Sequence, residues 1–135
     1  MHDVAYIALG SNLGDRDAEL ARARKAIATL PDTRIVGEST IEETQPIGPA
    51  QPWFLNQMIA VETSMTPHQL LRALQAIEQQ AGRTRGKRWG PRTLDLDIVC
   101  FGHQSVHEPD LWVPHPELPN RDFWQRELAE LRGTR

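Results

Sequence analysis

Two carboxylates follow a cluster of fixed positive charges in the second half of the chain. Residues 83–92 contain four arginines and one lysine, and glycine and proline interrupt this stretch. Asp95 and Asp97 come next, two positions apart in an apolar segment. Arginine side chains bind phosphate oxygens through paired hydrogen bonds, and carboxylates are preferred ligands of Mg²⁺. The combination predicts a site for a metal-bound polyphosphate.

The spacing of the two aspartates decides whether they can act together. Side chains alternate between the faces of a strand, so we expect Asp95 and Asp97 on one face, with Leu94, Leu96 and Ile98 in the core. Two acids on an exposed strand face also occur without any ligand, where they simply solvate the strand. The neighbouring cations favour the metal-binding interpretation, because a divalent cation removes the repulsion between the carboxylates.

Trp89 stands among the cations, which a purely solvated turn does not require. It either covers the core or closes over a ligand, and Gly82, Gly86 and Gly90 supply hinge positions for such a closure. We favour the lid. A solvated turn and a nucleic-acid-binding patch are the alternatives for the basic stretch.

Aromatic and polar residues elsewhere suggest a second part of the site. Phe54 and Phe123 could sandwich a flat heterocycle while Asn56 reads its polar edge, although each aromatic alone is more typical of a core. His115 lies between two prolines, where it either donates to a phosphate or has a structural role. His68 belongs to no recognisable constellation, and no His and Cys pair has the spacing of a zinc site.

The composition is that of a folded protein. The chain has 135 residues, of which 39% are hydrophobic and 24% charged, so we expect one domain over residues 1–135. The formal net charge of −3 argues against a globally basic nucleic-acid binder. Cys100 is the single cysteine, the first residues resemble no signal peptide, and no apolar run has the length of a membrane span. These features predict a cytoplasmic protein without nucleic-acid or membrane partners.

Hydrophobic periodicity and turn residues divide the chain into elements that could position these side chains. The predicted strands cover residues 4–9, 33–43, 55–63 and 94–101, and the first predicted helix covers residues 13–30. Thr66, Pro67 and Gln69 form a capping box that begins a second helix, which Gly82 ends. Residues 45–52 and 107–120 are proline-rich, the former a shaped loop and the latter stiff and extended. Residues 124–131 are predicted to form a short closing helix.

The order of these elements predicts the fold. Each helix most simply crosses over between strands of a single sheet, which gives the order β-α-β-β-α-β. We therefore expect an α+β, ferredoxin-like sandwich with an antiparallel sheet, helices on one face, and a short C-terminal extension.

Three segments resemble one enzyme family. Residues 8–14 (ALGSNLG), 88–98 (RWGPRTLDLDI) and 113–116 (VPHP) are similar to the 6-hydroxymethyl-7,8-dihydropterin pyrophosphokinases of folate biosynthesis. The resemblance extends from about Tyr6 to about Leu131, and the central block is very specific. It implies the ferredoxin-like fold and an enzyme that transfers pyrophosphate from MgATP to the pterin's hydroxymethyl oxygen, releasing AMP.

The resemblance also implies roles for individual residues. Asp95 and Asp97 would bind two Mg²⁺ ions, and Arg83 and Arg92 would act with them in catalysis on a mobile loop. The residues implied to bind ATP are Gln75, Glu78, Arg85, Trp89, Arg92, Ile98, His115 and Arg121. The residues implied to bind the pterin are Thr44, Pro46, Ile47, Gly48, Phe54, Asn56 and Phe123.

The chain departs from the family pattern in places. Trp112 stands where a small hydroxyl residue is usual, which alters one nucleotide contact and is expected to narrow the ATP cleft. The loop between Arg85 and Arg88 is slightly short, and the chain stops soon after Leu131, earlier than is usual for the family.

Two alternatives to the enzyme remain open. A non-catalytic paralogue that only binds pterin or nucleotide is supported by the short C-terminus, and opposed by the presence of both acids, the loop arginines and both aromatics. A ferredoxin-like RNA-binding module would use the basic stretch, but the net charge of −3 and the adjacent acids disfavour it. We favour the enzyme, acting as a monomer.

Overall fold

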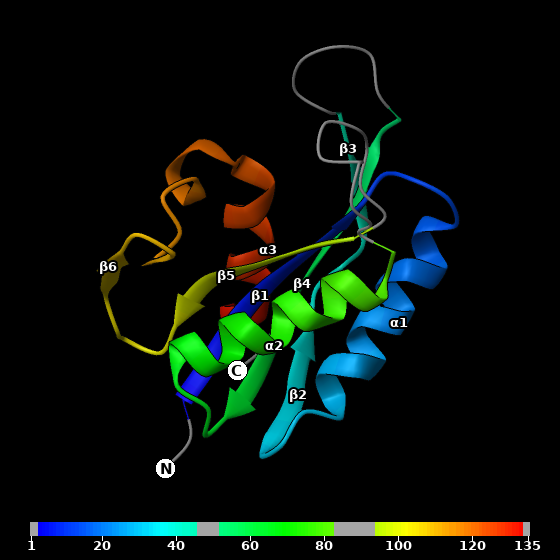
Figure 1. Ribbon diagram of the computed structural model, residues 1–135. Helices are drawn as coiled ribbons and strands as arrows, with labels where there is room; N and C mark the ends of the chain where they lie inside the picture. Colours follow the sequence, from blue (N-terminus) through cyan, green and yellow to red (C-terminus); the bar gives the residue numbers. More distant parts are fainter. Residues whose placement is uncertain (1–2, 46–51, 83–93, 134–135) are drawn as a thin grey trace.

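A single antiparallel sheet organises the molecule (Figure 1). The computed structural model describes residues 3–45, 52–82 and 94–133. The strands of the main sheet are β1 (Asp3–Ser11), β2 (Thr33–Glu38), β3 (Glu42–Thr44), β4 (Phe54–Thr63) and β5 (Asp95–Phe101). Their order is β2-β4-β1-β5, and β3 also pairs with β4. All of these pairings are antiparallel, as the sequence predicted.

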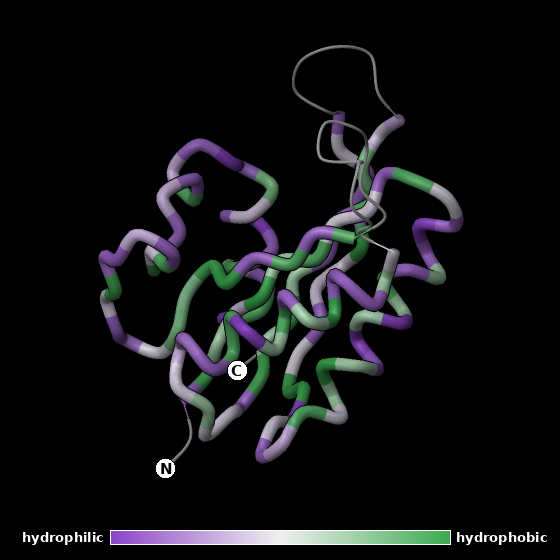
Figure 2. Tube along the Cα trace, in the orientation of Figure 1, coloured by the Kyte–Doolittle hydropathy of each residue, from purple (hydrophilic) through white to green (hydrophobic). Residues whose placement is uncertain are grey.

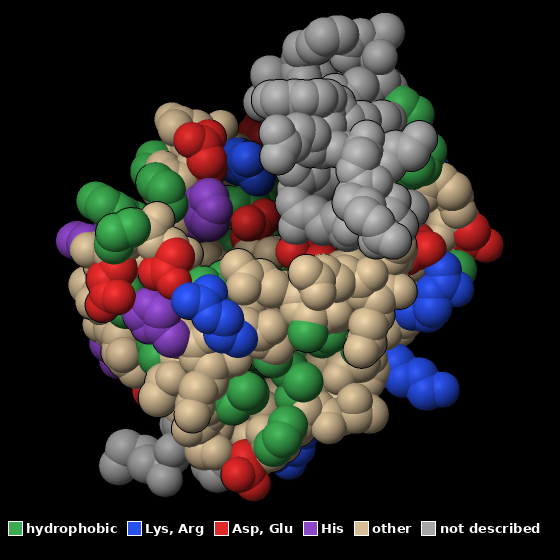
Figure 3. All heavy atoms as spheres, viewed as in Figure 1, with side chains coloured by type: hydrophobic (Ala, Val, Ile, Leu, Met, Phe, Trp, Pro, Cys, Tyr) green, Lys and Arg blue, Asp and Glu red, His purple; other side chains and the backbone are tan. Residues whose placement is uncertain are grey.

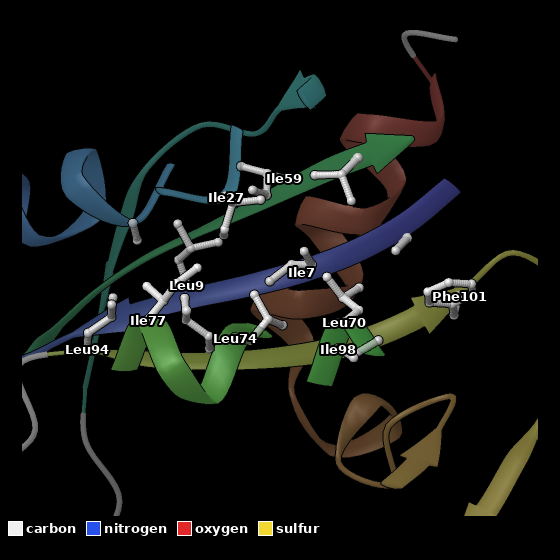
Figure 4. Packing of buried hydrophobic residues seen from close by; sticks show 14 of the residues in the cluster. Ile7, Leu9, Ile27, Ile59, Leu70, Leu74, Ile77, Leu94, Ile98 and Phe101 are labelled. Atoms are coloured by element: carbon white, nitrogen blue, oxygen red, sulfur yellow. The ribbon is translucent and has the colours of Figure 1, made fainter. Parts of the chain in front are cut away.

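Two helices cover one face of the sheet. Helices α1 (Arg16–Ala28) and α2 (Pro67–Gln80) pack there over a core that the strands supply with alternate residues. Figure 4 shows Ile7, Leu9, Ile27, Leu74 and other members of this core between the strands and the helices. Hydrophobic stretches accordingly concentrate in the central strands (Figure 2). The predicted crossover arrangement is confirmed for both helices.

A third helix covers the opposite face. Helix α3 (Asp122–Gly133) packs Trp124, Leu128 and Leu131 against Tyr6 and Met58, and it lies behind the sheet in Figure 1. The sequence predicted this helix but not its face. The sheet is therefore buried on both sides.

The limits of the helices follow local capping chemistry. Thr66 and Gln69 form the predicted capping box of α2, and Gly82 lies just beyond its end with a φ of +94°, a conformation that favours glycine. The predicted start of the first helix at Leu13 is wrong. Asp15 caps α1 by accepting from the amide of Ala18, so the helix begins at Arg16 and Leu13 is 42% exposed.

The proline-rich segment after β5 is more structured than predicted. It forms a hairpin of β6 (Val106–Glu108) and β7 (Leu111–Val113), followed by the 3₁₀ turn η1 (Leu118–Asn120). The rings of His107 and Trp112 stack across the hairpin with their centroids 4.5 Å apart. No helix within residues 3–45, 52–82 and 94–133 is long and apolar enough to cross a membrane.

Candidate active site

Three adjacent strands bring polar residues to one face of the sheet. Gly10 on β1 lies opposite Asn56 on β4 and opposite Asp95 on β5, and residues directly opposite one another in an antiparallel pair share a face. Asp97 lies two positions further along β5, opposite Ala8. An open cleft of about 880 Å³ lies over this row.

The cleft collects many of the residues that the sequence singled out. It is lined by Thr44, Phe54, Asn56, Asp95, Asp97, Arg121 and Phe123. Residues far apart in sequence therefore meet because β3, β4, β5 and the start of α3 converge on one side of the sheet. The two aromatics are half-buried, and the Asn56 amide nitrogen donates to the Thr44 hydroxyl.

The two aspartates have the predicted orientation. Both line the cleft and are half-buried, whereas Leu94, Leu96 and Ile98 between and beside them are buried in the core. The hydrophobic alternation of β5 thus delivers two hard oxygen donors to the same space.

Glu78 of α2 holds β5 at the position between the aspartates. Its carboxylate accepts from the Leu96 amide at 2.7 Å, and the side chain is buried. Gln75 is exposed and accepts from Arg72 at 3.3 Å. Within the described part of the chain, neither Gln75 nor Glu78 lines a cavity, so their contact with ATP stays a prediction.

A second cavity of about 400 Å³ adjoins the first. Asp97, Ile98, Trp112 and His115 line it together with apolar residues such as Leu111, between β5 and the β6–β7 hairpin. Asp97 lines both cavities and so stands where they meet.

His115 faces this junction. Its Nε2 lies 3.7 Å from Oδ1 of Asp97, and its Nδ1 accepts from the Glu117 amide at 3.0 Å. Because Nδ1 is an acceptor, the proton of the neutral ring is on Nε2, toward the carboxylate. The imidazole also packs edge-on against Trp124, with centroids 4.9 Å apart.

Several lining residues gave no local signal in the sequence. Gly10 lies in the ALGSNLG segment, but it was read only as part of a turn. Trp124 was assigned to the core, and it also supports Arg121, whose guanidinium lies 4.4 Å from the centroid of the indole ring. Arg126 lines the cleft and pairs with Glu42 at 2.9 Å. Only the tertiary fold brings this arginine to the site.

Glu127 is buried next to the cleft-lining turn of α3. It is 1% exposed, and burial together with the nearby Glu42 carboxylate raises the pKa of Glu127 to about 9. Its carboxyl group is therefore protonated at neutral pH.

The remaining predicted site residues lie outside the described part of the chain. These are Pro46, Ile47, Gly48, Arg83, Arg85, Trp89 and Arg92.

Comparison with known proteins identifies similar sequences over almost the whole chain. Residues 6–133 match the profile of the 7,8-dihydro-6-hydroxymethylpterin-pyrophosphokinase family. A 2-amino-4-hydroxy-6-hydroxymethyldihydropteridine pyrophosphokinase of Pseudomonas aeruginosa is 48% identical over 127 residues, which cover 93% of this chain and 78% of the relative. The enzyme of the same name from Bacillus subtilis is 43% identical over 132 residues, covering 97% and 79%.

A solved structure shares the fold. The crystal structure of an HPPK-DHPS in complex with substrates superposes with a TM-score of 0.72 at 14% sequence identity. The alignment covers 97% of this chain, and this chain spans 40% of the length of that one. At this identity the likeness concerns the fold alone.

Proposed function

The chain belongs to the 7,8-dihydro-6-hydroxymethylpterin-pyrophosphokinase family, and from this premise we propose which residues bind the substrates and carry the reaction. The enzyme transfers pyrophosphate from ATP to the hydroxymethyl group of the dihydropterin in folate biosynthesis. The position of Asp97 in both cavities carries the proposal, because a transfer between two substrates needs their reacting groups to meet at one place.

The larger cleft is the proposed pterin site. Phe54 and Phe123 offer aromatic surface for the flat ring system, and Asn56 with Thr44 offers hydrogen bonds to its polar edge. The backbone of residues 46–48 completes this site in the proposal.

The smaller cavity is the proposed site for the nucleoside of ATP. Ile98 and Trp112 supply apolar surface, and His115 with its Nε2 proton faces the junction where the phosphates would lie. Arg121 lines the cleft and would reach the phosphates from α3. The further proposed ATP contacts are Gln75, Glu78, Arg83, Arg85, Trp89 and Arg92.

Asp95 and Asp97 fit magnesium. Both offer carboxylate oxygens to the same cleft, and Mg²⁺ prefers one or two carboxylates together with phosphate oxygens and water. We propose that they hold two Mg²⁺ ions with ATP, which when bound neutralise phosphate charge. The two acids would otherwise repel both each other and the triphosphate.

The reaction itself requires positioning rather than a covalent intermediate. The pterin hydroxyl oxygen forms a bond to the β-phosphorus, the bond from that phosphorus to the oxygen bridging to the α-phosphate breaks, and AMP leaves. Arg83 and Arg92 are the proposed cations for the developing charge, at roughly 2–4 kcal/mol for such a group. We further propose a single-domain monomer that acts in the cytoplasm.

Release of AMP tests the assignment. Protein incubated with MgATP and 6-hydroxymethyl-7,8-dihydropterin should form AMP and the pterin diphosphate in equal amounts. Asp97→Ala should abolish turnover by removing a metal ligand. Asp17→Asn, an exposed acid on α1, is the matched control and should retain full activity. Undiminished turnover in Asp97→Ala would refute the metal assignment.

A further inference from the structure

Three potential metal ligands meet outside the proposed active site. His68 in the first turn of α2 lies beside Glu108 and Asp110 of the β6–β7 hairpin, and one ligand atom of each lies within 4.8 Å of the others. In Figure 3, histidine and acidic side chains gather where the hairpin meets the start of α2. The sequence showed no such cluster, because about 40 residues separate the histidine from the acids.

The distances suit a shared ion. Nε2 of His68 lies 3.1 Å from Oε1 of Glu108 and 3.4 Å from Oδ1 of Asp110. With zinc–ligand bonds of about 2.0–2.1 Å, the ligand atoms of a tetrahedral site lie about 3.4 Å apart. The imidazole nitrogen and each carboxylate oxygen can therefore bind one ion with little movement.

The charges also favour a dication. The N-terminal turn of a helix disfavours a positive imidazolium, so the helix dipole opposes protonation of His68. A neutral ring has only one Nε2 proton to donate, whereas two carboxylates face that nitrogen. The described groups around the cluster add one cation, Arg72, which pairs with Asp110.

Arg72 orients the cluster as an outer partner of a metal ligand does. Its guanidinium lies 2.7 Å from Oδ2 of Asp110, which leaves Oδ1 toward His68. This hydrogen bond is the main reason that the pKa of Asp110 is lowered, so the carboxylate is ionised at neutral pH.

We propose that His68, Glu108 and Asp110 bind Zn²⁺. One imidazole and two carboxylates suit zinc, and a water molecule would complete the tetrahedron. Glu108 and Asp110 also line the smaller cavity. The ion would join α2 to the hairpin wall of that cavity, and its binding does not depend on the function proposed above.

Zinc titration of untagged, metal-stripped protein tests this site. The background variant Asp97→Asn and an excess of MgCl₂ suppress zinc binding at the proposed magnesium position. Calorimetry should then show one Zn²⁺ per chain, and Co²⁺ should give the visible absorption of a tetrahedral site. Adding His68→Gln should weaken zinc binding by at least about 100-fold and remove the cobalt band.

His103→Gln is the matched control, since His103 is exposed and lies outside the cluster. It should retain the affinity, the cobalt band and a zinc-dependent rise in Tm, all of which His68→Gln should lose. Equal zinc affinity in the two variants, or no zinc binding in the background protein, would overturn the proposal.

Discussion

At Gly10 the missing side chain is itself a feature of the cleft. A Cβ atom there would lie 3.2 Å from Oδ1 of Asn56 and 3.6 Å from Phe54, which are two of the proposed pterin contacts. Glycine at this register position therefore keeps the floor of the cleft open between β4 and β5.

Gly10→Ala should selectively weaken pterin binding. Moving the Asn56 amide disturbs a buried hydrogen bond, and we expect a loss of about 1–3 kcal/mol in pterin affinity with a smaller change in the KM for ATP. Steady-state kinetics with each substrate varied would measure this. Gly133→Ala, where a Cβ meets nothing within 4 Å, should behave as wild type. An unchanged KM for the pterin in Gly10→Ala would contradict the prediction.

Glu127→Gln should stabilise the protein as the pH rises. The pKa of Glu127 is raised from 4.5 to about 9 in the folded state, so its favourable contribution is complete below about pH 4.5. That contribution is lost as the pH rises through 9, at no more than about 1.4 kcal/mol per pH unit. Glutamine, which carries no charge, should flatten this dependence.

Urea unfolding at pH 5, 7 and 9 would measure the effect. The difference in unfolding free energy between Glu127→Gln and wild type should grow with pH. Glu117→Gln, at an exposed position, should follow the wild-type curve. Parallel curves for Glu127→Gln and wild type would show that the carboxyl is not held protonated.

At the scale of elements, strand β5 depends on helix α2. Glu78 accepts from the Leu96 amide, and Leu96 lies between the two proposed metal ligands. Helix α2 thus supports the backbone that carries both aspartates.

Glu78→Ala should lower both stability and kcat. Loss of a charged acceptor to a buried amide costs about 1.5–3 kcal/mol of unfolding free energy, and it frees the backbone between the aspartates. Glu78→Gln keeps an oxygen acceptor and should retain more of both properties. Urea unfolding and AMP release would be measured together. Wild-type stability in Glu78→Ala would mean that the hydrogen bond does not support β5.

Local chemistry made much of the fold predictable from the sequence. The capping box at Thr66 and the alternation through β4 and β5 each depend on neighbouring residues, and both are confirmed. The start of α1 was misplaced because Leu13 matched the helical spacing, while the cap at Asp15 decided the boundary. Arg126 was missed because its place in the cleft depends on how α3 packs on the sheet.

The site was predictable to the extent that its residues lie on one strand. The common face of Asp95 and Asp97 follows from the period of a strand. The sandwich of Phe54 and Phe123 was only a weak hypothesis, because it joins β4 to α3, and the family resemblance made it specific. The cluster at His68 had no sequence signal, since a hairpin hidden among prolines supplies its acids.

For the whole molecule, the sheet has a core on each face. Residues on α1 and α2 fill one side, and Trp124, Leu128 and Leu131 of α3 fill the other. Because α3 also supplies Phe123 and Arg126 to the cleft, packing of the second core sets the position of part of the proposed site.

Leu128→Ala should destabilise the protein and disturb the cleft. Truncation of a buried leucine costs about 2–5 kcal/mol of unfolding free energy, and it loosens the helix that carries Phe123. Leu13→Ala, at a leucine that is 42% exposed, should have little effect. Thermal unfolding and the KM for the pterin would be compared. Equal Tm values for the two variants would contradict the role of the second core.

Strand β1 has consequences for which changes of length the chain tolerates. Ile7 and Leu9 face one core, Tyr6 and Ala8 face the other, and Gly10 lies under the cleft. Inserting or deleting one residue within β1 would exchange the two sets and would also move the gap at Gly10 away from Asn56. Natural insertions and deletions among relatives should therefore fall in the connections between elements, and β1 should keep its length.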